Sequence, residues 1–254
     1  MIDLHCHLLP GIDDGPGSLA EAVAICRAAA ADGCEALVAT PHQGHSRWLN
    51  EDPLALRRLL ARVRGEVGPH PRLHLGGEIR IGSELMKYLL DPRRGGYLPL
   101  ADSRYLLLEF PRGGPIVRPE ELVHELTLHD WRPIIAHPEF YPEFTDDLDL
   151  MARLVKAGAA FQVTAMSLTG EFGRRIRGNT VRLLDSGLVD FLASDAHGLD
   201  RRPPGLRGAR QVIAARWGEE VGERLTVTNP RAVLENRPLS DDSRARNLTA
   251  RVGG

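Results

Sequence analysis

Residues 1–15 read MIDLHCHLLPGIDDG, a short apolar run that ends in two histidines and leads into a pair of aspartates. The run Ile2–His5 is too short for a stable helix, and we predict that it forms a strand. Side chains alternate along a strand, so His5 and His7 point to one side while Cys6 points to the other. The chain therefore opens with a strand that presents two imidazoles together near its carboxyl end.

Six further apolar runs follow, and longer amphipathic stretches separate them. We predict strands over Ala36–Thr40, Leu73–Glu78, Tyr105–Glu109, Pro133–His137, Ala160–Thr164 and Asp190–Ser194. These runs are continuous rather than alternating, which is typical of strands covered on both faces of a parallel sheet. Repeated βα units predict an α/β fold, with the sheet either closed as a barrel or open and doubly wound. No GxGxxG or GxxxxGK[ST] motif follows any run, which removes the usual nucleotide-binding reasons for an open sheet.

The stretches between the runs carry helix signals. Ser18 and Glu21 form a capping box before the first helix, and Gly33 ends it. Further helices are predicted over Pro53–Val67, Pro119–His129, Asp147–Ala157, Gly173–Ser186 and Leu206–Trp217. Asn229 followed by Pro230 is typical of a cap that opens a last short helix. Apolar periodicity is lost from about residue 236, so we expect one domain over 1–235 and a flexible tail over 236–254.

The composition is that of an ordinary one-domain globular protein. The 254 residues are 43% hydrophobic and 26% charged, and a net charge of −2 gives no general attraction to nucleic acid or anionic membranes. No basic and apolar leader opens the chain, and no uncharged apolar stretch approaches the roughly 20 residues that span a bilayer. Three cysteines cannot pair completely and form no CxxC knuckle. We therefore expect a soluble protein of the reducing cytoplasm.

Histidines and carboxylates close most of the apolar runs. They are His5 and His7 with Asp13 and Asp14 shortly after, then His42, Glu78, Glu109, His137, and the pair Asp195 and His197. The carboxyl ends of parallel strands meet at one mouth of a sheet, so we expect these groups to converge. Imidazole and carboxylate suit zinc, manganese or iron. Counting only one of the two aspartates, nine such groups exceed what one ion coordinates, which predicts two or three divalent metal ions, a pair of them bridged by Glu78.

A single histidine or glutamate at a strand end is more often a hydrogen-bonded or solvated structural residue than a ligand. The joint appearance of these residues, each closing its own run, is what favours a metal site. Five other histidines fall outside the pattern or on predicted helices and are assigned no role: His45, His70, His74, His124 and His129.

Taken together, the motifs resemble the PHP (polymerase and histidinol phosphatase) superfamily of metallohydrolases, and within it the bacterial tyrosine phosphatases of capsular and exopolysaccharide synthesis. The matching segments are Met1–Gly15, Ala39–His42, Gly77–Ile81, Asp102–Phe110, Ile134–Tyr141 and Ala193–Pro204. The resemblance covers the first 235 positions or so. It implies a distorted TIM-like (βα)7 barrel that holds three metal ions.

The resemblance also implies a ligand set. One ion is expected at His5, His7, Glu78 and Asp195, a second at Glu78, Glu109 and His137, and a third at Asp14, His42 and His197. Asp14 is preferred to Asp13 because the ligand in these proteins is the second aspartate of the Asp-Asp-Gly triplet. Asp13 is expected to have a turn or capping role.

Two arginines contact the phosphate in these phosphatases. One matches Arg202, but Phe140 stands at the position of the other, and phenylalanine cannot replace a guanidinium. Candidates for the missing charge are Arg80, Arg174 and Arg175. Phe140 is instead a candidate for stacking on an aromatic leaving group.

The function implied is hydrolysis of phosphotyrosine on a protein by attack of a metal-bridging hydroxide. The partner would be a bacterial tyrosine kinase of exopolysaccharide synthesis, and manganese is one of the suitable metals. A cysteine mechanism is not expected, because no Cys-x5-Arg loop is present. Three alternatives stay open: a phosphatase for a small phosphoester such as histidinol phosphate, a metal-binding regulator with weak activity, and an amidohydrolase-like hydrolase. The last is disfavoured because neither Lys87 nor Lys156 closes an apolar run, as a metal-bridging carbamylated lysine would.

Overall fold

A computed structural model describes residues 1–91, 96–113, 116 and 118–240. Its strands are β1 (Ile2–Cys6), β2 (Ala36–Ala39), β3 (His42–Gln43), β4 (Arg72–Leu75), β5 (Glu78–Arg80), β6 (Tyr105–Glu109), β7 (Arg132–Ala136), β8 (Ala160–Thr164) and β9 (Phe191–Ala193). They form two parallel sheets, in the orders β1-β2-β4 and β3-β5-β6-β7-β8-β9. The sheets continue into one another, because β3 follows β2 and β5 follows β4 after only two residues.

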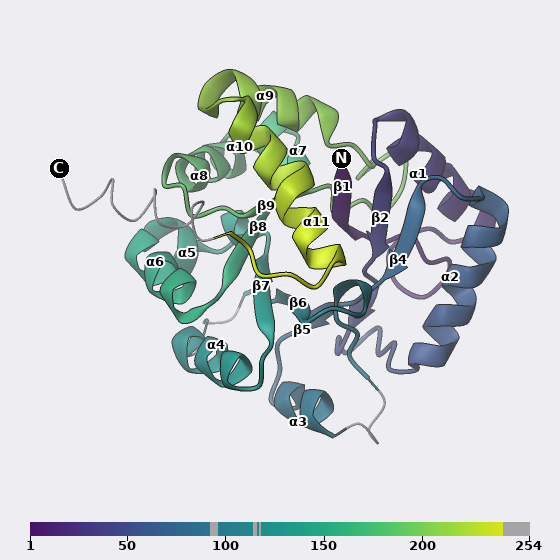
Figure 1. The fold of residues 1–254 in the computed structure, drawn as a ribbon, viewed down its shortest axis with the longest axis horizontal. Coiled ribbons are helices and arrows are strands. Elements are labelled where there is room, and N and C mark those ends of the chain that lie inside the picture. Colours follow the sequence, from purple (N-terminus) through teal and green to yellow (C-terminus); the bar gives the residue numbers. More distant parts are fainter. Residues whose placement is uncertain (92–95, 114–115, 117, 241–254) are drawn as a thin grey trace.

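The barrel closes between its first and last strands. A bridge joins Cys6 to Ala196, with the His7 amide donating to the Ala196 carbonyl at 2.8 Å. The buried carboxylate of Asp3 accepts from the Ser194 amide at 3.1 Å, which ties β1 to β9 at a second point. With β2 and β3 counted as one position, and β4 and β5 as another, seven strand positions surround the lumen (Figure 1). The predicted distorted (βα)7 barrel is thereby confirmed.

Helices cover the outside of the barrel, apart from the last of them, which lies across one end of it (Figure 1). They are α1 (Leu19–Ala31), α2 (Pro53–Val67), α3 (Leu85–Leu90), α4 (Pro119–Leu128), α5 (Pro142–Asp146), α6 (Leu148–Ala157), α7 (Ala165–Thr169), α8 (Gly173–Asp185), α9 (Arg207–Trp217), α10 (Glu219–Glu223) and α11 (Asn229–Leu234). The predicted capping box is confirmed in part: Ser18 Oγ accepts from the Glu21 amide at 3.3 Å, whereas the Glu21 carboxylate accepts from the Gly17 amide, at 2.8 Å, in place of the Ser18 amide. The short helices α3, α5, α7 and α10 were not predicted, because each is six residues or fewer and too brief to show a period. Among the described residues, no helix has both the length and the apolar character needed to cross a membrane.

Apolar side chains fill the lumen at the amino ends of the strands. Ile2, Tyr105 and Phe191 pack there against Ala232 and Val233 of α11, which lies across this end of the barrel (Figure 1). A larger cluster lies between the strands and the surrounding helices. With its amino end sealed by apolar packing, the barrel has its polar groups at the carboxyl end.

The predicted strand Leu73–Glu78 is in fact two strands, and this prediction was wrong. The break falls at Gly76 and Gly77, where the Gly76 amide donates to Ala39 and the Glu78 amide to Pro41. A Cβ atom on Gly77 would collide with the side chain of Gln43. The break therefore gives the Gln43 side chain its place and starts β5 at Glu78, in register with His42.

Asn229 does not cap a helix as predicted. Backbone angles are helical from α10 through a π-helical turn at Arg224–Thr228 and on into α11. The Asn229 side chain is buried and donates instead to the Asp190 carbonyl at 2.9 Å. It therefore joins α11 to the start of β9.

Residues 236–240, placed in the predicted flexible tail, are packed against the barrel. Asn236 Oδ1 accepts from the Arg104 amide at 2.9 Å, and the Arg237 carbonyl accepts from the Tyr105 hydroxyl at 2.8 Å. Leu239 is buried in the lumen cluster. The ordered structure thus extends past the predicted boundary, and residues 241–254 lie outside the described part of the chain.

Candidate metal centre

The predicted ligands converge at the carboxyl end of the barrel, around a cavity of about 190 Å³. Its lining includes Asp14, His42, Glu78, Glu109, His137, Asp195 and His197, with His5 and His7 fully buried beneath. Larger hollows exist elsewhere, among them one of about 570 Å³ beside Trp131 and Arg132, at the opposite end of the strands. The described residues show clusters with metal-ligand geometry in three groups, and all three belong to the convergent set.

The first group consists of His5, His7 and Asp195. Nε2 of His5 lies 3.3 Å from Nε2 of His7 and 3.2 Å from Oδ1 of Asp195. The alternation of β1 brings the two imidazoles together, as predicted. Asp195 joins them because its amide donates to the His5 carbonyl at 2.9 Å across the closing seam of the barrel.

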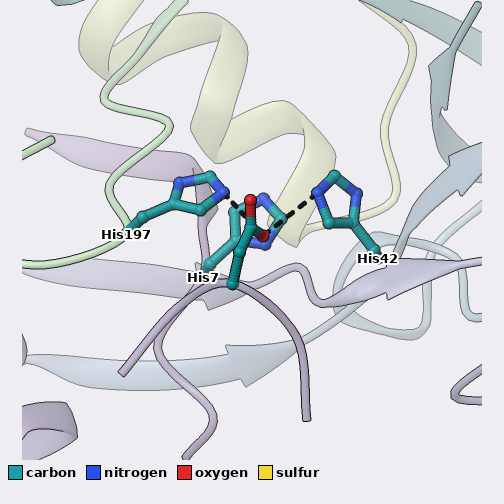
Figure 2. A group of neighbouring side chains, drawn as sticks. His7, His42 and His197 are labelled. Carbon is teal, nitrogen blue, oxygen red and sulfur yellow. Dashed lines mark ion pairs between the residues drawn. The ribbon is translucent and has the colours of Figure 1, made fainter. Parts of the chain in front are cut away.

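Asp14, His42 and His197 form the second group, together with His7. Asp14 Oδ1 lies 3.4 Å from His42 Nε2 and 3.2 Å from His197 Nε2. Figure 2 shows His42 and His197 on either side, each with a dashed ion pair directed inward, and His7 between them. The rings of His7 and His197 are stacked, with their centroids 3.8 Å apart. The set assigned to the third ion is thus brought together, with His7 as an additional member.

Glu78 is the centre of the third group. Its carboxylate lies 2.8 Å from His42 Nδ1, 2.9 Å from His137 Nε2 and 3.3 Å from His7 Nε2. Glu109 Oε1 lies 4.0 Å from His137 Nε2. His42 also groups with these two glutamates, a membership that the sequence did not predict. The position of Glu78 among several imidazoles is the one a bridging carboxylate needs.

Three hydrogen bonds orient the imidazoles from behind. His7 Nδ1 lies 2.9 Å from Asp13 Oδ2, His5 Nδ1 lies 3.0 Å from Gln162 Oε1, and the His197 ring bonds the Asp195 carbonyl at 2.9 Å. A donor hydrogen on Nδ1 leaves the lone pair on Nε2, the nitrogen that faces the cluster. Asp13 also accepts from the Gly15 amide, as its predicted turn role requires.

Gln162 was missed by the sequence analysis. Its only signal is one polar side chain within the apolar run of β8. Nothing in that run indicates which residue Gln162 contacts.

The electrostatics of the cluster favour added positive charge. Burial would raise the pKa of Glu78, but the imidazoles of His5, His137 and His42 hold it well below its usual value. Burial opposes protonation of His7, yet the Asp13 and Glu78 carboxylates raise its pKa to about 9. The carboxylates that raise the pKa of His7 also attract metal cations, which displace its proton on binding.

The donor set fits divalent metal ions. Glu109 Oε2 is buried and makes no hydrogen bond within the described chain. His42 Nδ1 and Glu78 Oε2 are only 2.8 Å apart, yet they are not aligned to bond each other. Buried polar atoms that lack hydrogen bonds are costly, and a bound metal ion would remove that cost. His137 and Asp195 also have left-handed backbones, with φ of 38° and 54°, a strain that often accompanies functional residues.

Arginines surround the cavity. The Arg202 guanidinium pairs with Asp195 and lies 3.4 Å from His197 Nε2. Of the three arginines suggested for the missing charge, Arg80 lines the cavity, whereas Arg174 and Arg175 do not. Arg112 also lines it and was missed by the sequence analysis.

Comparisons with known proteins agree with this geometry. The family model described as capsular polysaccharide synthesis, CpsB/CapC, matches residues 1–235. Tyrosine-protein phosphatase YwqE of Bacillus subtilis is 37% identical over 94% of this chain and 93% of its own. Tyrosine-protein phosphatase CpsB of Streptococcus pneumoniae is 27% identical over 92% of this chain and 98% of its own.

Solved structures extend the comparison. One belongs to a study of the crystal structures of YwqE from Bacillus subtilis and CpsB from Streptococcus pneumoniae, which are described as unique metal-dependent tyrosine phosphatases. It matches with a TM-score of 0.86 and 36% identity, over 94% of this chain and 96% of that chain. An amidohydrolase from Mycoplasma synoviae covers 96% of this chain and 90% of its own, with a TM-score of 0.58 and 12% identity, which shows a shared fold alone. This chain belongs to the CpsB/CapC family of capsular polysaccharide synthesis.

Proposed function

We propose that this protein is a metal-dependent tyrosine-protein phosphatase of capsule synthesis. The observation that carries the proposal is the convergence of nine imidazole and carboxylate groups, from segments far apart in the sequence, at one cavity. The family relation and the names of the relatives support the same activity. We further propose two or three bound ions of manganese, zinc or iron, held by the three groups described above.

The roles of the residues follow from their positions. Bound divalent ions supply Lewis acidity, which activates water and neutralises phosphate charge. His5, His7, Asp195 and the other ligands hold those ions, and Asp13 and Gln162 fix the orientation of two of the rings. Arg202, at the rim, would bind phosphate oxygens through paired hydrogen bonds. The phenolate of tyrosine has a parent pKa of about 10, so its departure needs little help from an acid.

A protein substrate is favoured over a small phosphoester by the surroundings of the cavity. A groove of about 640 Å³ adjoins it and shares Asp14, His197 and Arg202 with it. The groove continues between α1 and the segment 198–202, which gives room for the peptide on one side of a phosphotyrosine. We propose that the substrate is a phosphorylated bacterial tyrosine kinase and that the enzyme is cytoplasmic, where its three free cysteines would stay reduced.

The test compares metals and substrates together. The chelated protein is reloaded with manganese, zinc or iron and assayed on a phosphotyrosine peptide, the matching phosphoserine peptide and histidinol phosphate. We expect turnover of the phosphotyrosine peptide only after reloading, and its loss in Glu78→Gln with folding retained. Glu125→Gln is the matched control, because Glu125 lies on α4, outside the cluster. Faster turnover of histidinol phosphate would favour the small-molecule phosphatase, and bound metal without any turnover would favour a metal-binding regulator.

A further inference from the structure

Arg112 occupies a distinct position at the cavity. It follows the end of β6 by three residues and lines the cavity that the metal ligands surround. Its side chain is 54% exposed, against 27% for Arg80 and 25% for Arg202. It is therefore the cavity arginine most accessible to an incoming ligand.

Phe140 holds the guanidinium of Arg112. The central carbon of that group lies 4.9 Å from the centroid of the Phe140 ring, a cation–π contact. Phe140 is itself fixed edge-on by His137 at 5.9 Å and by Phe172 at 5.4 Å. A long, exposed side chain usually loses much rotamer freedom on binding a ligand, and this aromatic support reduces that loss.

Arg202 is the cavity arginine most closely engaged, in an ion pair with Asp195. Arg80 and Arg112 both lie near Glu109, with Arg80 Nη1 3.7 Å from its Oε2 and Arg112 Nε 3.9 Å from its Oε1. Arg112 therefore differs from Arg80 in its greater exposure and in its contact with Phe140, not in its distance from a carboxylate.

We propose that Arg112 is a phosphate-binding residue, positioned by Phe140, and that it contacts the phosphoryl group of the substrate together with Arg202. This inference rests on the proposed phosphatase function. It assigns a substrate contact to a residue that the metal centre does not use. Phe140 acts through Arg112 and is therefore a positioning residue.

The experiment uses the metal-loaded protein and two readouts. Calorimetry measures binding of inorganic phosphate, and steady-state kinetics measures hydrolysis of a phosphotyrosine peptide. Arg112→Met removes the charge and keeps most of the length. We expect phosphate to bind roughly 10–100-fold more weakly and KM to rise. A loss of this size corresponds to one hydrogen bond with a charged group. Metal content should be unchanged. Arg153→Met is the control, because Arg153 is equally exposed, at 55%, and lies on α6.

The role of Phe140 is tested by variants that remove or keep an aromatic ring at this position. Phe140→Leu removes the ring and should cause part of the defect of Arg112→Met, mainly as a rise in KM. Phe140→Trp keeps an aromatic ring and should bind phosphate as the wild-type protein does. In an Arg112→Met background, Phe140→Leu should have no further effect on phosphate binding. A purely structural role of Phe140 would instead lower thermal stability and add to the Arg112→Met defect.

The outcomes separate the two proposals. Phosphate binding in Arg112→Met equal to that in Arg153→Met would overturn this inference, even if the wild-type protein is an active phosphatase. Absence of turnover on every phosphoester would overturn the proposed function. An Arg112-dependent loss of phosphate binding would still support the contact in that case.

Discussion

Oδ2 of Asp13 lies 2.9 Å from Nδ1 of His7, and the same imidazole presents its Nε2 to Glu78 at 3.3 Å. The aspartate side chain is 1% exposed, so the pair is shielded from solvent. Asp13 Oδ2 also accepts from the His42 amide at 3.2 Å, and this one carboxylate therefore orients two neighbouring ligands.

The first prediction concerns this carboxylate. Asp13→Asn keeps the size of the side chain but removes the charge that fixes His7. We expect metal affinity or activity to fall by about 10–100-fold, as is typical for partners behind metal ligands. Metal titration of the chelated variant measures the affinity. Asp149→Asn serves as the control, since Asp149 lies on α6. Unchanged metal binding in Asp13→Asn would show that the hydrogen bond has no role in orienting His7.

The second prediction concerns the thiols. Burial raises the pKa of Cys26 to about 12 and raises that of Cys6 and Cys34 as well. A raised pKa leaves less thiolate at a given pH, so all three should be protonated at pH 8. We expect iodoacetamide at pH 8 to leave the folded protein unlabelled and active, with labelling only after denaturation. Mass spectrometry measures both states.

Cys6→Ala provides an independent check on the same point. Cys6 lies between His5 and His7, two of the proposed ligands, but its side chain packs in the apolar cluster between the strands and the helices, so the variant should retain substantial activity. His7→Ala should be inactive. A Cys6→Ala protein that binds its metals normally but has no activity would point to a covalent thiol mechanism.

Local sequence was sufficient for much of the barrel. The predicted bounds Tyr105–Glu109, Ala160–Thr164 and Pro53–Val67 are those of β6, β8 and α2. Buried parallel strands are uninterrupted apolar runs, and α2 begins at a proline after Asp52, which caps it. Where the hydrophobic periodicity and the residues at the ends of an element agreed, the bounds of that element could be predicted to the residue.

Features that depend on distant contacts could not be predicted. The break before Glu78 exists because the Gln43 side chain, from another strand, fills the space beside Gly77. Likewise, Asn229 resembles a cap in sequence but bonds Asp190, far along the chain. The sharing of His42 between two ligand groups also depends on its register with Glu78. No local pattern encodes such contacts.

The third prediction concerns the C-terminal boundary. A chain that ends at Glu235 should be much less stable than a chain that ends at Ser240. The shorter chain loses the buried Leu239 and the hydrogen bonds of Asn236 and Arg237 with the barrel. Leu239→Ala alone should cost about 2–5 kcal/mol, the range for a buried leucine. Urea unfolding measures each. Equal stability of the two truncations would contradict the packing of residues 236–239.

The fourth prediction concerns Gly77, in the break between β4 and β5, and its effect on the neighbouring metal centre. Gln43 Oε1 accepts from the Leu98 amide at 2.7 Å, while its Nε2 donates to the carbonyls of Asn50 and Gly96. Because three hydrogen bonds hold this side chain, it cannot move aside for a methyl group on Gly77. Gly77→Ala should therefore displace either Gln43 or the neighbouring Glu78, and lower both thermal stability and metal affinity. In Gln43→Ala the space is empty, so adding Gly77→Ala should cause little further loss of metal affinity. If the two losses were instead additive, the collision with Gln43 would not be their cause.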